Sequence, residues 1–251
     1  MGRYFVVLIL LAVVLGLSAR HFALSNKTDQ SLSKDEQSFA QARRIMVERD
    51  LKGRDITKQK VLEVMAKVPR HRFVGKRYLG QAYADHPLPI GEGQTISQPY
   101  IVALMTQWLH VGEGDTVLEV GTGSGYQAAV LAEIVDKVYT VEIREKLAQK
   151  ADTLLHELGY TNIEVKAADG YFGWGEHAPF DGIIVTAAAN HVPPPLIKQL
   201  KEGGRMVIPV GNPYSYQKLV LLEKKDGEIF SQNITGVLFV PMVGEIEKNG
   251  K

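Results

Sequence analysis

The stretch V-L-E-V-G-T-G-S-G, residues 117–125, decides the fold of this chain. Its apolar first half has the composition of a buried strand, and a helical pattern begins directly after it at Tyr126. Between them, glycine occupies every second position and predicts a tight turn: Gly121, Gly123 and Gly125. A strand that leads through such a turn to a helix N-terminus indicates a ligand-binding loop. A dinucleotide-binding loop, G-x-G-x-x-G, would need glycine where this chain has Tyr126, so a dehydrogenase is disfavoured.

Two further strand-like runs end in acidic residues. Residues 138–142 end in Glu142, whose carboxylate could accept two hydrogen bonds from the hydroxyls of a ribose. Residues 163–168 lead into Asp169 and Gly170, an acceptor beside flexible backbone that would suit an adenine amino group. The three strand ends therefore predict a site for a nucleoside-like ligand. A second interpretation stays open, in which Glu142 and Asp169 only cap the helices that follow them.

The pattern around these strands predicts a doubly wound α/β fold, a mostly parallel sheet with helices on both faces. Residues 115–210 alternate between strand and helix patterns, which is typical of this architecture. Amphipathic or apolar helices are predicted at 37–51, 58–68 and 99–109, with a loop at 74–94. Two more strands are predicted at 219–224 and 234–240, the first followed by a turn at Asp226-Gly227.

The composition excludes several kinds of chemistry. A formal charge of +1 over 251 residues gives no field that would recruit nucleic acid, so no nucleic-acid partner is expected. With no cysteine, the chain can form neither disulfides nor thiolate sites. We expect no metal site, because the histidines lack the spacing of metal ligands: His86, His110, His156, His177 and His191.

The N-terminal region differs from the rest of the chain. Residues 1–24 form an apolar segment, with an almost unbroken run at 4–19, and residues 25–37 resemble a polar linker before a domain at 38–251. The apolar run has the charged start and length of a secretory signal, but its candidate cleavage sites are poor. It could be cleaved, anchor the chain to a membrane, or reflect a mis-assigned start codon.

Residues 95–99, T-I-S-Q-P, closely resemble the substrate-side loop of the protein-L-isoaspartate O-methyltransferases. The resemblance continues through the glycine turn, A-D-G at 168–170 and I-P-V-G at 208–211, and covers roughly residues 38–244. It implies a class I S-adenosylmethionine-dependent methyltransferase that methylates the α-carboxylate of L-isoaspartyl residues in damaged proteins and peptides. The chain departs from the family pattern at Asn190-His191-Val192, which affects what can be expected of the substrate rim.

The resemblance also assigns roles to residues. Ser97 is expected to orient the substrate carboxylate, although it could instead cap the helix that begins near Pro99. Gln217 is a weaker candidate for contact with the substrate. The residues expected at the cofactor are Thr95, Ile96, Glu119, Gly121, Thr122, Gly123, Ser124, Gly125, Glu142, Asp169 and Gly170.

Two alternative functions remain at this point: a methyltransferase for another carboxylate acceptor, and a membrane-tethered binding module without catalysis. We expect a monomer that works in the cytoplasm, where S-adenosylmethionine is made. Attachment to the inner membrane face through residues 4–19 is an option. The competing expectation is export to the periplasm, since the same residues resemble an export signal.

Overall fold

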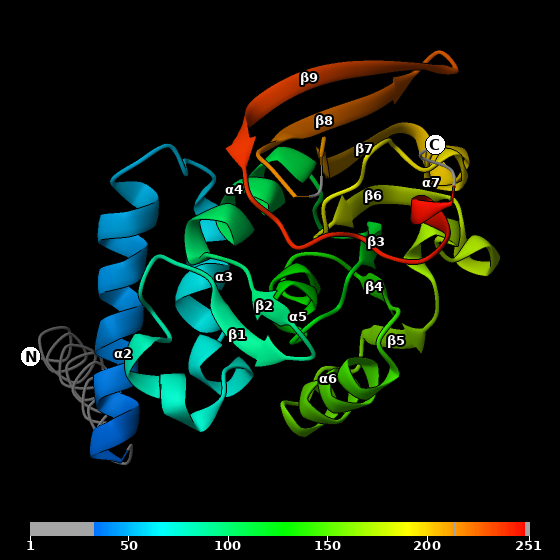
Figure 1. Cartoon of the computed structure of the whole chain (residues 1–251). Coiled ribbons are helices and arrows are strands. Elements are labelled where there is room, and N and C mark those ends of the chain that lie inside the picture. The colour runs from blue at the N-terminus through cyan, green and yellow to red at the C-terminus, as the bar shows by residue number, and fades with distance from the viewer. Residues whose placement is uncertain (1–32, 213, 249–251) are drawn as a thin grey trace, which may run out of the picture. The chain divides into compact units, whose positions relative to one another are not determined.

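The computed structural model describes residues 33–212 and 214–248 (Figure 1). The chain divides into two compact units, Met1–Ala42 and Arg43–Lys251, which are described separately. Within the first unit, the described residues hold the beginning of helix α2 (Lys34–Ile45), so the last residues of the predicted linker 25–37 are helical. The predicted apolar segment 1–24 lies outside the described residues. Within the described ranges, no helix is long and apolar enough to cross a membrane.

Short helices open the second unit. The end of α2 continues into a π-helix, η1 (Met46–Lys52), and is followed by α3 (Gln59–Lys67). Two 3-10 helices come next, η2 (Arg70–Phe73) and η3 (Lys76–Gln81). The helices predicted at 37–51 and 58–68 are thus confirmed, although the first changes its hydrogen-bonding pattern after Ile45. Helix α3 ends before Pro69, which disfavours helical backbone at the residue that precedes it.

A seven-stranded sheet forms the centre of the second unit, in the order β5-β4-β3-β6-β7-β8-β9 (Figure 1). The first five strands in this order pair in parallel, and the last two are added antiparallel. This arrangement confirms the predicted fold class. The strands are β3 (Thr116–Val120), β4 (Lys137–Glu142), β5 (Ile163–Ala167), β6 (Phe180–Val185), β7 (Leu200–Val210), β8 (Gln217–Lys225) and β9 (Glu228–Val237).

Helices connect the parallel strands and determine where a ligand can bind. α5 (Tyr126–Ala132) and α6 (Glu145–Glu157) lead from β3 through β4 to β5, and α7 (Pro194–Gln199) leads from β6 to β7. Right-handed crossovers that run in opposite directions place α7 on the other face from α5 and α6. The order of strands reverses beside β3, and ligands in such sheets bind at the carboxyl ends of the strands at this point. Helix α4 (Pro99–Leu109), which precedes β3, matches its prediction.

Two segments differ from the sequence prediction. The predicted loop 74–94 contains the start of a small antiparallel hairpin, β1 (Leu88–Gly91) and β2 (Gln94–Ile96). β9 begins at residue 228 rather than 234. The sequence did not indicate its first half, because most residues of this edge strand are exposed and lack the apolar pattern of a buried strand. The predicted turn before it is confirmed, with φ values of 54° at Asp226 and 77° at Gly227.

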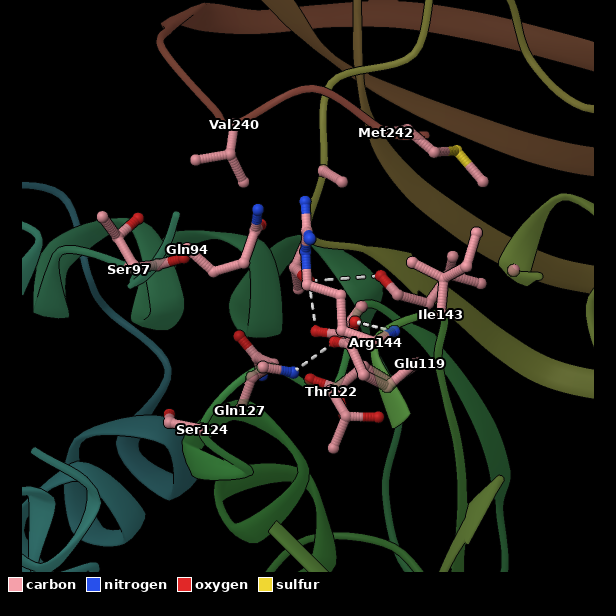
Figure 2. Close-up of a pocket in the computed structure, with 18 of the residues that line it drawn as sticks. Gln94, Ser97, Glu119, Thr122, Ser124, Gln127, Ile143, Arg144, Val240 and Met242 are labelled. Carbon is pink, nitrogen blue, oxygen red and sulfur yellow. Dashed lines mark hydrogen bonds between the residues drawn. The ribbon is translucent and has the colours of Figure 1, made fainter. Parts of the chain in front are cut away.

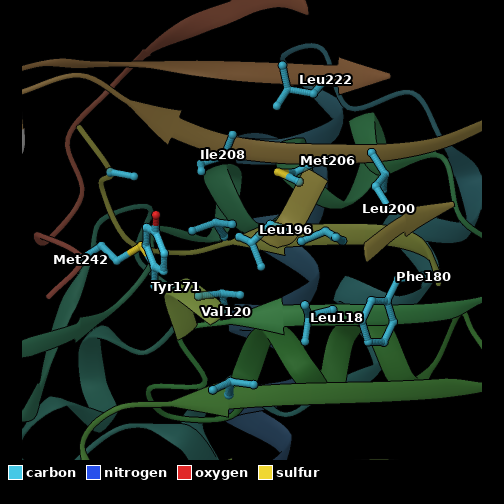
Figure 3. Packing of buried hydrophobic residues seen from close by; sticks show 14 of the residues in the cluster. Leu118, Val120, Tyr171, Phe180, Leu196, Leu200, Met206, Ile208, Leu222 and Met242 are labelled. Carbon is cyan, nitrogen blue, oxygen red and sulfur yellow. The ribbon is translucent and has the colours of Figure 1, made fainter. Parts of the chain in front are cut away.

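One cluster of the hydrophobic core lies between the sheet and α7 (Figure 3). Leu118 and Val120 of β3 face Leu196 of α7, and all three are almost completely buried. At one end of this cluster, Tyr171 packs beside Met242, which comes from the segment after β9. The core therefore fixes both the end of β3 and the C-terminal segment that approaches it.

Candidate active site

The glycine loop after β3 has a backbone that only glycine adopts readily. Gly121, Gly123 and Gly125 have φ values of 100°, 53° and 85°. A Cβ atom on Gly121 would lie 2.4 Å from Oγ1 of Thr186, which donates a hydrogen bond of 2.6 Å to the carbonyl of Gly121. A Cβ atom on Gly125 would press against Leu155 at 3.3 Å. The loop is thereby held close to the sheet, with its backbone open to the space above it.

A cavity of about 790 Å³, partly open to solvent, lies above this loop at the carboxyl ends of β3 and β4 (Figure 2). Figure 2 shows Val240 and Met242 across the cavity from Thr122 and Ser124. Most of the predicted site residues line it: Thr95, Ile96, Ser97, Glu119, Gly121, Thr122, Gly123, Ser124, Glu142 and Gly170.

Glu142, the last residue of β4, is 6% exposed and lines the cavity. Its Oε2 accepts a hydrogen bond from the amide of Gly123 at 2.9 Å, and its Oε1 accepts one from the amide of Arg144 at 2.9 Å. These bonds fix the carboxylate beside the glycine loop. A carboxylate has about four lone-pair sites, so Glu142 can still accept hydrogen bonds from a ligand diol.

Glu119 is fully buried in β3 and has one oxygen without a partner among the described residues, Oε1. The hydroxyl of Thr140 donates to its Oε2 at 2.6 Å, and Thr140 lies 2.6 Å from the hydroxyl of Thr122. Burial raises the pKa of Glu119 to about 8; the Thr140 hydrogen bond opposes this shift, and the charge of Glu142 adds to it. A buried acceptor left unpaired at a cavity wall is a specific signal for a ligand, because such groups are otherwise costly.

The segment Thr95-Ile96-Ser97, which connects β2 to α4, forms another wall of the cavity. β2 ends at Ile96, and α4 begins at Pro99 with Gln98 as its N-cap and no side-chain capping bond. The alternative role of Ser97 as a helix cap is therefore wrong. In the described part of the chain, the Ser97 hydroxyl makes no hydrogen bond, so it is available to a ligand.

Arg70, which the sequence analysis did not single out, supports this wall from behind. It is fully buried and donates from Nη2 to the carbonyl of Ser97 at 2.7 Å and from Nε to the carbonyl of Ala82 at 2.8 Å. Burial lowers the pKa of its guanidinium to about 10, and the group stays charged at neutral pH. Because Arg70 fixes the Ser97 carbonyl, it also holds the Ser97 hydroxyl at the cavity. No motif in the sequence indicated this role of Arg70.

Asp169 and Gly170 follow β5 and have different surroundings. Gly170 lines the cavity, and a Cβ atom on it would lie 2.4 Å from Cγ1 of Val120. Asp169 is not among the lining residues. Its Oδ1 accepts from the amide of Tyr171 at 2.9 Å, as in the capping alternative, and its Oδ2 accepts from the amide of Glu245 at 2.7 Å. Contact between Asp169 and adenine stays a prediction.

Gln217 and Gly125 also lie outside the cavity lining. Gln217 is 2% exposed, and its amide nitrogen donates to the carbonyls of Asn212 and Ser215. Its Oε1 accepts from the amide of Phe239 at 2.8 Å. The structure thus uses Gln217 to tie a loop to the segment that enters the cavity at Val240. Direct contact with a substrate would require these bonds to break.

Several lining residues were missed by the sequence analysis. The segment 240–243 reaches the cavity because Met242 donates its amide to the carbonyl of Ala188 at 2.8 Å, and Ala188 donates to Val240 at 2.8 Å. On the other side, Arg144 lies within hydrogen-bonding distance, 3.1 Å, of the Gln94 amide oxygen when that amide is turned towards it. Neither contact has a local sequence signal, because each joins segments that are distant along the chain.

The residues around the cavity fit S-adenosylmethionine. Glu142 can accept from a diol, Glu119 brings to the cavity wall a carboxyl oxygen without a partner among the described residues, and the glycine loop allows close approach. No group of three or more His, Asp or Glu side chains within 33–212 and 214–248 could hold a metal ion.

The sheet order and this cavity define a class I S-adenosylmethionine-dependent methyltransferase. The family model of protein-L-isoaspartate(D-aspartate) O-methyltransferase matches residues 41–247. The chain belongs to this family, whose methyl donor is S-adenosylmethionine.

Individual relatives agree with this assignment. The chain is 56% identical over 215 residues to protein-L-isoaspartate O-methyltransferase 2 of Shewanella sediminis, an alignment that covers 86% of this chain and 88% of the relative. A solved protein-L-isoaspartate O-methyltransferase is 32% identical, with a TM-score of 0.75 over 81% of this chain and 67% of the other. Another, from Plasmodium falciparum in complex with S-adenosyl-L-homocysteine, is 27% identical, with a TM-score of 0.70 over 80% of this chain and 98% of the other.

Proposed function

We propose that this chain repairs proteins by methylating the α-carboxylate of L-isoaspartyl residues, with Ser97 as the group that orients the acceptor. The observation that carries this proposal is the position of Ser97. Its hydroxyl makes no hydrogen bond to any residue that the structure describes, and Ser97 lines the same cavity as Glu119 and Glu142. One cavity thus joins residues suited to the methyl donor with a hydrogen-bond donor suited to a carboxylate.

The reaction needs positioning rather than a general base. S-adenosylmethionine supplies a methyl group bonded to a positively charged sulfur. The acceptor carboxylate is ionised at neutral pH, so its oxygen can form the new bond to the methyl carbon as the carbon–sulfur bond breaks and leaves its electrons on sulfur. Ser97 donates a hydrogen bond to the second carboxylate oxygen and Arg70 keeps the Ser97 backbone fixed. Orientation of this kind supplies roughly 7 to 11 kcal/mol in the best intramolecular examples.

A peptide methylation assay tests the proposal. The full chain should transfer labelled methyl groups to an isoaspartyl peptide and not to the matched aspartyl peptide. Ser97→Ala should lower kcat/KM by about tenfold to a hundredfold, the value of a hydrogen bond to a charged group, and leave cofactor affinity nearly unchanged. Ser231→Ala, at an exposed serine of β9, is the matched control. Equal methylation of both peptides, or preference for a different carboxylate in a panel of acceptors, would overturn the proposed acceptor.

We further propose that residues 38–251 form the catalytic domain and act as a monomer. Every residue around the cavity lies beyond residue 93. Because α2 begins at Lys34, truncation before Ser33 keeps this helix whole. The protein of residues 33–251, which contains the proposed domain, should sediment as a monomer and bind S-adenosylmethionine in calorimetric titration. A folded protein that gives no heat would show that binding needs residues before Ser33.

For the cellular location, we propose catalysis in the cytoplasm, with residues 4–19 available to attach the chain to the inner membrane face. This proposal rests on where the methyl donor is made. A fusion of residues 1–37 to a reporter that is active only after export provides the test. Strong reporter activity with processing near Ala19 or Ala23 would show export instead.

A further inference from the structure

A second cavity, of about 730 Å³ with its opening to solvent included, lies next to the cofactor cavity and is lined by the other strand of the β1–β2 hairpin. Strand β2 contributes to the cofactor cavity, whereas Pro89 and Ile90 of β1 line the second one. Its other walls are the η2–η3 segment and one face of α6. Apolar groups of Phe73, Ile90, Leu147 and Leu154 cover much of its interior. Nothing in the proposed methyl transfer uses this space.

The charged residues of this cavity are all basic. Arg72, Arg77 and Lys150 line it, and no aspartate or glutamate of the described residues does. Within the described residues, none of the three has a carboxylate partner; the guanidinium of Arg77 lies over the ring of Tyr78, 4.7 Å from its centre.

Some cations elsewhere on the surface are paired with acids. Arg54 lies 3.2 Å from Asp85, and Lys67 lies 2.5 Å from Glu133. Lys146, one turn before Lys150 on α6, lies 3.9 Å from Glu92. The second cavity therefore combines an apolar interior with three cations whose charge no neighbouring acid neutralises.

We propose that this second cavity binds a small amphiphilic anion, with its carboxylate or phosphate head at Arg72, Arg77 and Lys150 and its apolar body over Phe73, Ile90 and Leu147. The apolar and the basic side chains line one cavity, so a single small molecule can contact both kinds. Three basic side chains are complementary to an anionic head, and arginine suits the oxygens of carboxylates and phosphates in particular.

The position of this cavity brings its occupant close to the cofactor. Gly123 and Ser124 line both cavities, and a Cβ atom on Gly123 would lie 3.4 Å from Cδ1 of Ile90. The amide of Gly123 also holds Glu142. The second cavity and the cofactor cavity thus share the glycine loop as a wall.

Calorimetric titration of the full chain with decanoate, decyl phosphate and decanol tests the proposal. S-adenosylhomocysteine is kept in excess, so that the cofactor cavity is filled. We expect decanoate or decyl phosphate to bind at least about tenfold more tightly than neutral decanol. The comparison of the two anions shows which head group is preferred.

Variants locate the binding. Replacement of Arg72, Arg77 and Lys150 by glutamine should weaken anion binding by about tenfold or more, while decanol is affected little. Exposed cations outside the cavity provide the matched triple control, Lys198→Gln, Lys218→Gln and Lys225→Gln, which should bind like the wild type. If the first triple variant does not fold by circular dichroism, the single change Lys150→Gln, at an exposed position of α6, replaces it.

Three results would overturn the proposal. The first is no anion binding in the presence of S-adenosylhomocysteine, and the second is equal binding by both triple variants. The third is binding of an acidic peptide such as oligoglutamate in place of the decyl anions, which would assign the cavity to polypeptide.

Discussion

The ends of β4 and β5 carry the same sequence signal and different structures. Each strand ends beside an acidic residue, Glu142 or Asp169, and in both cases the carboxylate accepts two backbone amide hydrogen bonds. At β4 one of these amides belongs to the glycine loop, and the carboxylate stays at the cavity wall. At β5 one belongs to Glu245, from the C-terminal segment, and the carboxylate lies outside the cavity lining.

The difference arises from what packs against each strand end. Gly244 lies so close to Asp169 that a Cβ atom there would be 2.4 Å from Oδ2. The C-terminal segment thus packs against Asp169, whereas Glu142 faces the cavity. An acidic residue after a parallel strand indicates a place where a ligand can bind, but the segment that returns from elsewhere in the chain decides whether it does.

The largest effect should come from Glu142→Ala on cofactor binding. The change removes the acceptor for the ribose hydroxyls and leaves the amides of Gly123 and Arg144 without their partner. We expect S-adenosylmethionine affinity to fall by about 1.5 to 3 kcal/mol in calorimetric titration, with the fold intact by circular dichroism. A loss below about threefold would place the ribose elsewhere and remove the contrast with Asp169.

Glu119, at the cavity end of the sheet, should make the free energy of unfolding depend on pH. Its folded-state pKa of about 8 lies above the ordinary value of 4.5, because burial disfavours the charged form. The contribution of Glu119 to the free energy of unfolding is therefore complete below about pH 4.5. It is lost as the pH rises towards 8, by at most about 1.4 kcal/mol per pH unit.

Urea unfolding without cofactor measures this effect. Between pH 6 and 8, the wild type should lose about 2 kcal/mol more than Glu119→Gln, which cannot ionise. Glu157→Gln, at an exposed position in α6, should behave like the wild type. Parallel curves for the wild type and Glu119→Gln would mean that Glu119 is already ionised in the ligand-free protein.

Asp169→Ala should affect folding more than binding. It leaves the amides of Tyr171 and Glu245 unpaired and frees the segment that covers β5, so we expect a loss of about 1 to 2 kcal/mol in the free energy of unfolding. Its S-adenosylmethionine affinity should fall less than that of Glu142→Ala. An equal fall in affinity would support the contact with adenine that the sequence predicts for Asp169.

Strands β3 and β6 were predictable because they are short, mostly apolar runs that the fold buries. Residues 117–120 of β3 and 182–185 of β6 are buried at every position, so their pattern is strong. The β1–β2 hairpin was missed because its strands have four and three residues, too few for a period. β9 was recognised only in its second half, since it is a mostly exposed edge strand.

Site residues were predictable where a local sequence pattern, such as a strand end or a glycine turn, determines their position. The glycine loop and Glu142 belong to that group, because a local pattern determines where they lie. Arg70 and Gln217 do not, since each acts on carbonyls or amides of distant segments, 27 residues away for Ser97 and 22 for Phe239. The segment 240–243 likewise reaches the site through its pairing with Ala188, 54 residues before Met242.

The smallest effect should come from Glu164, an acidic residue within β5 rather than at its end. It is exposed and lies 2.6 Å from the ammonium group of Lys137 on β4. The pair joins the same two strands as the opening comparison but lies in solvent, where such ion pairs contribute less than about 1 kcal/mol. We expect Glu164→Gln to lower the free energy of unfolding by about 0.5 kcal/mol or less, and 1 M salt to remove most of that difference. Cofactor affinity should not change, because Glu164 is not among the residues that line the cavity. A loss as large as that of Asp169→Ala, unaffected by salt, would show that the β4–β5 contact depends on side-chain pairing rather than on its backbone ladder and the buried residues beneath it.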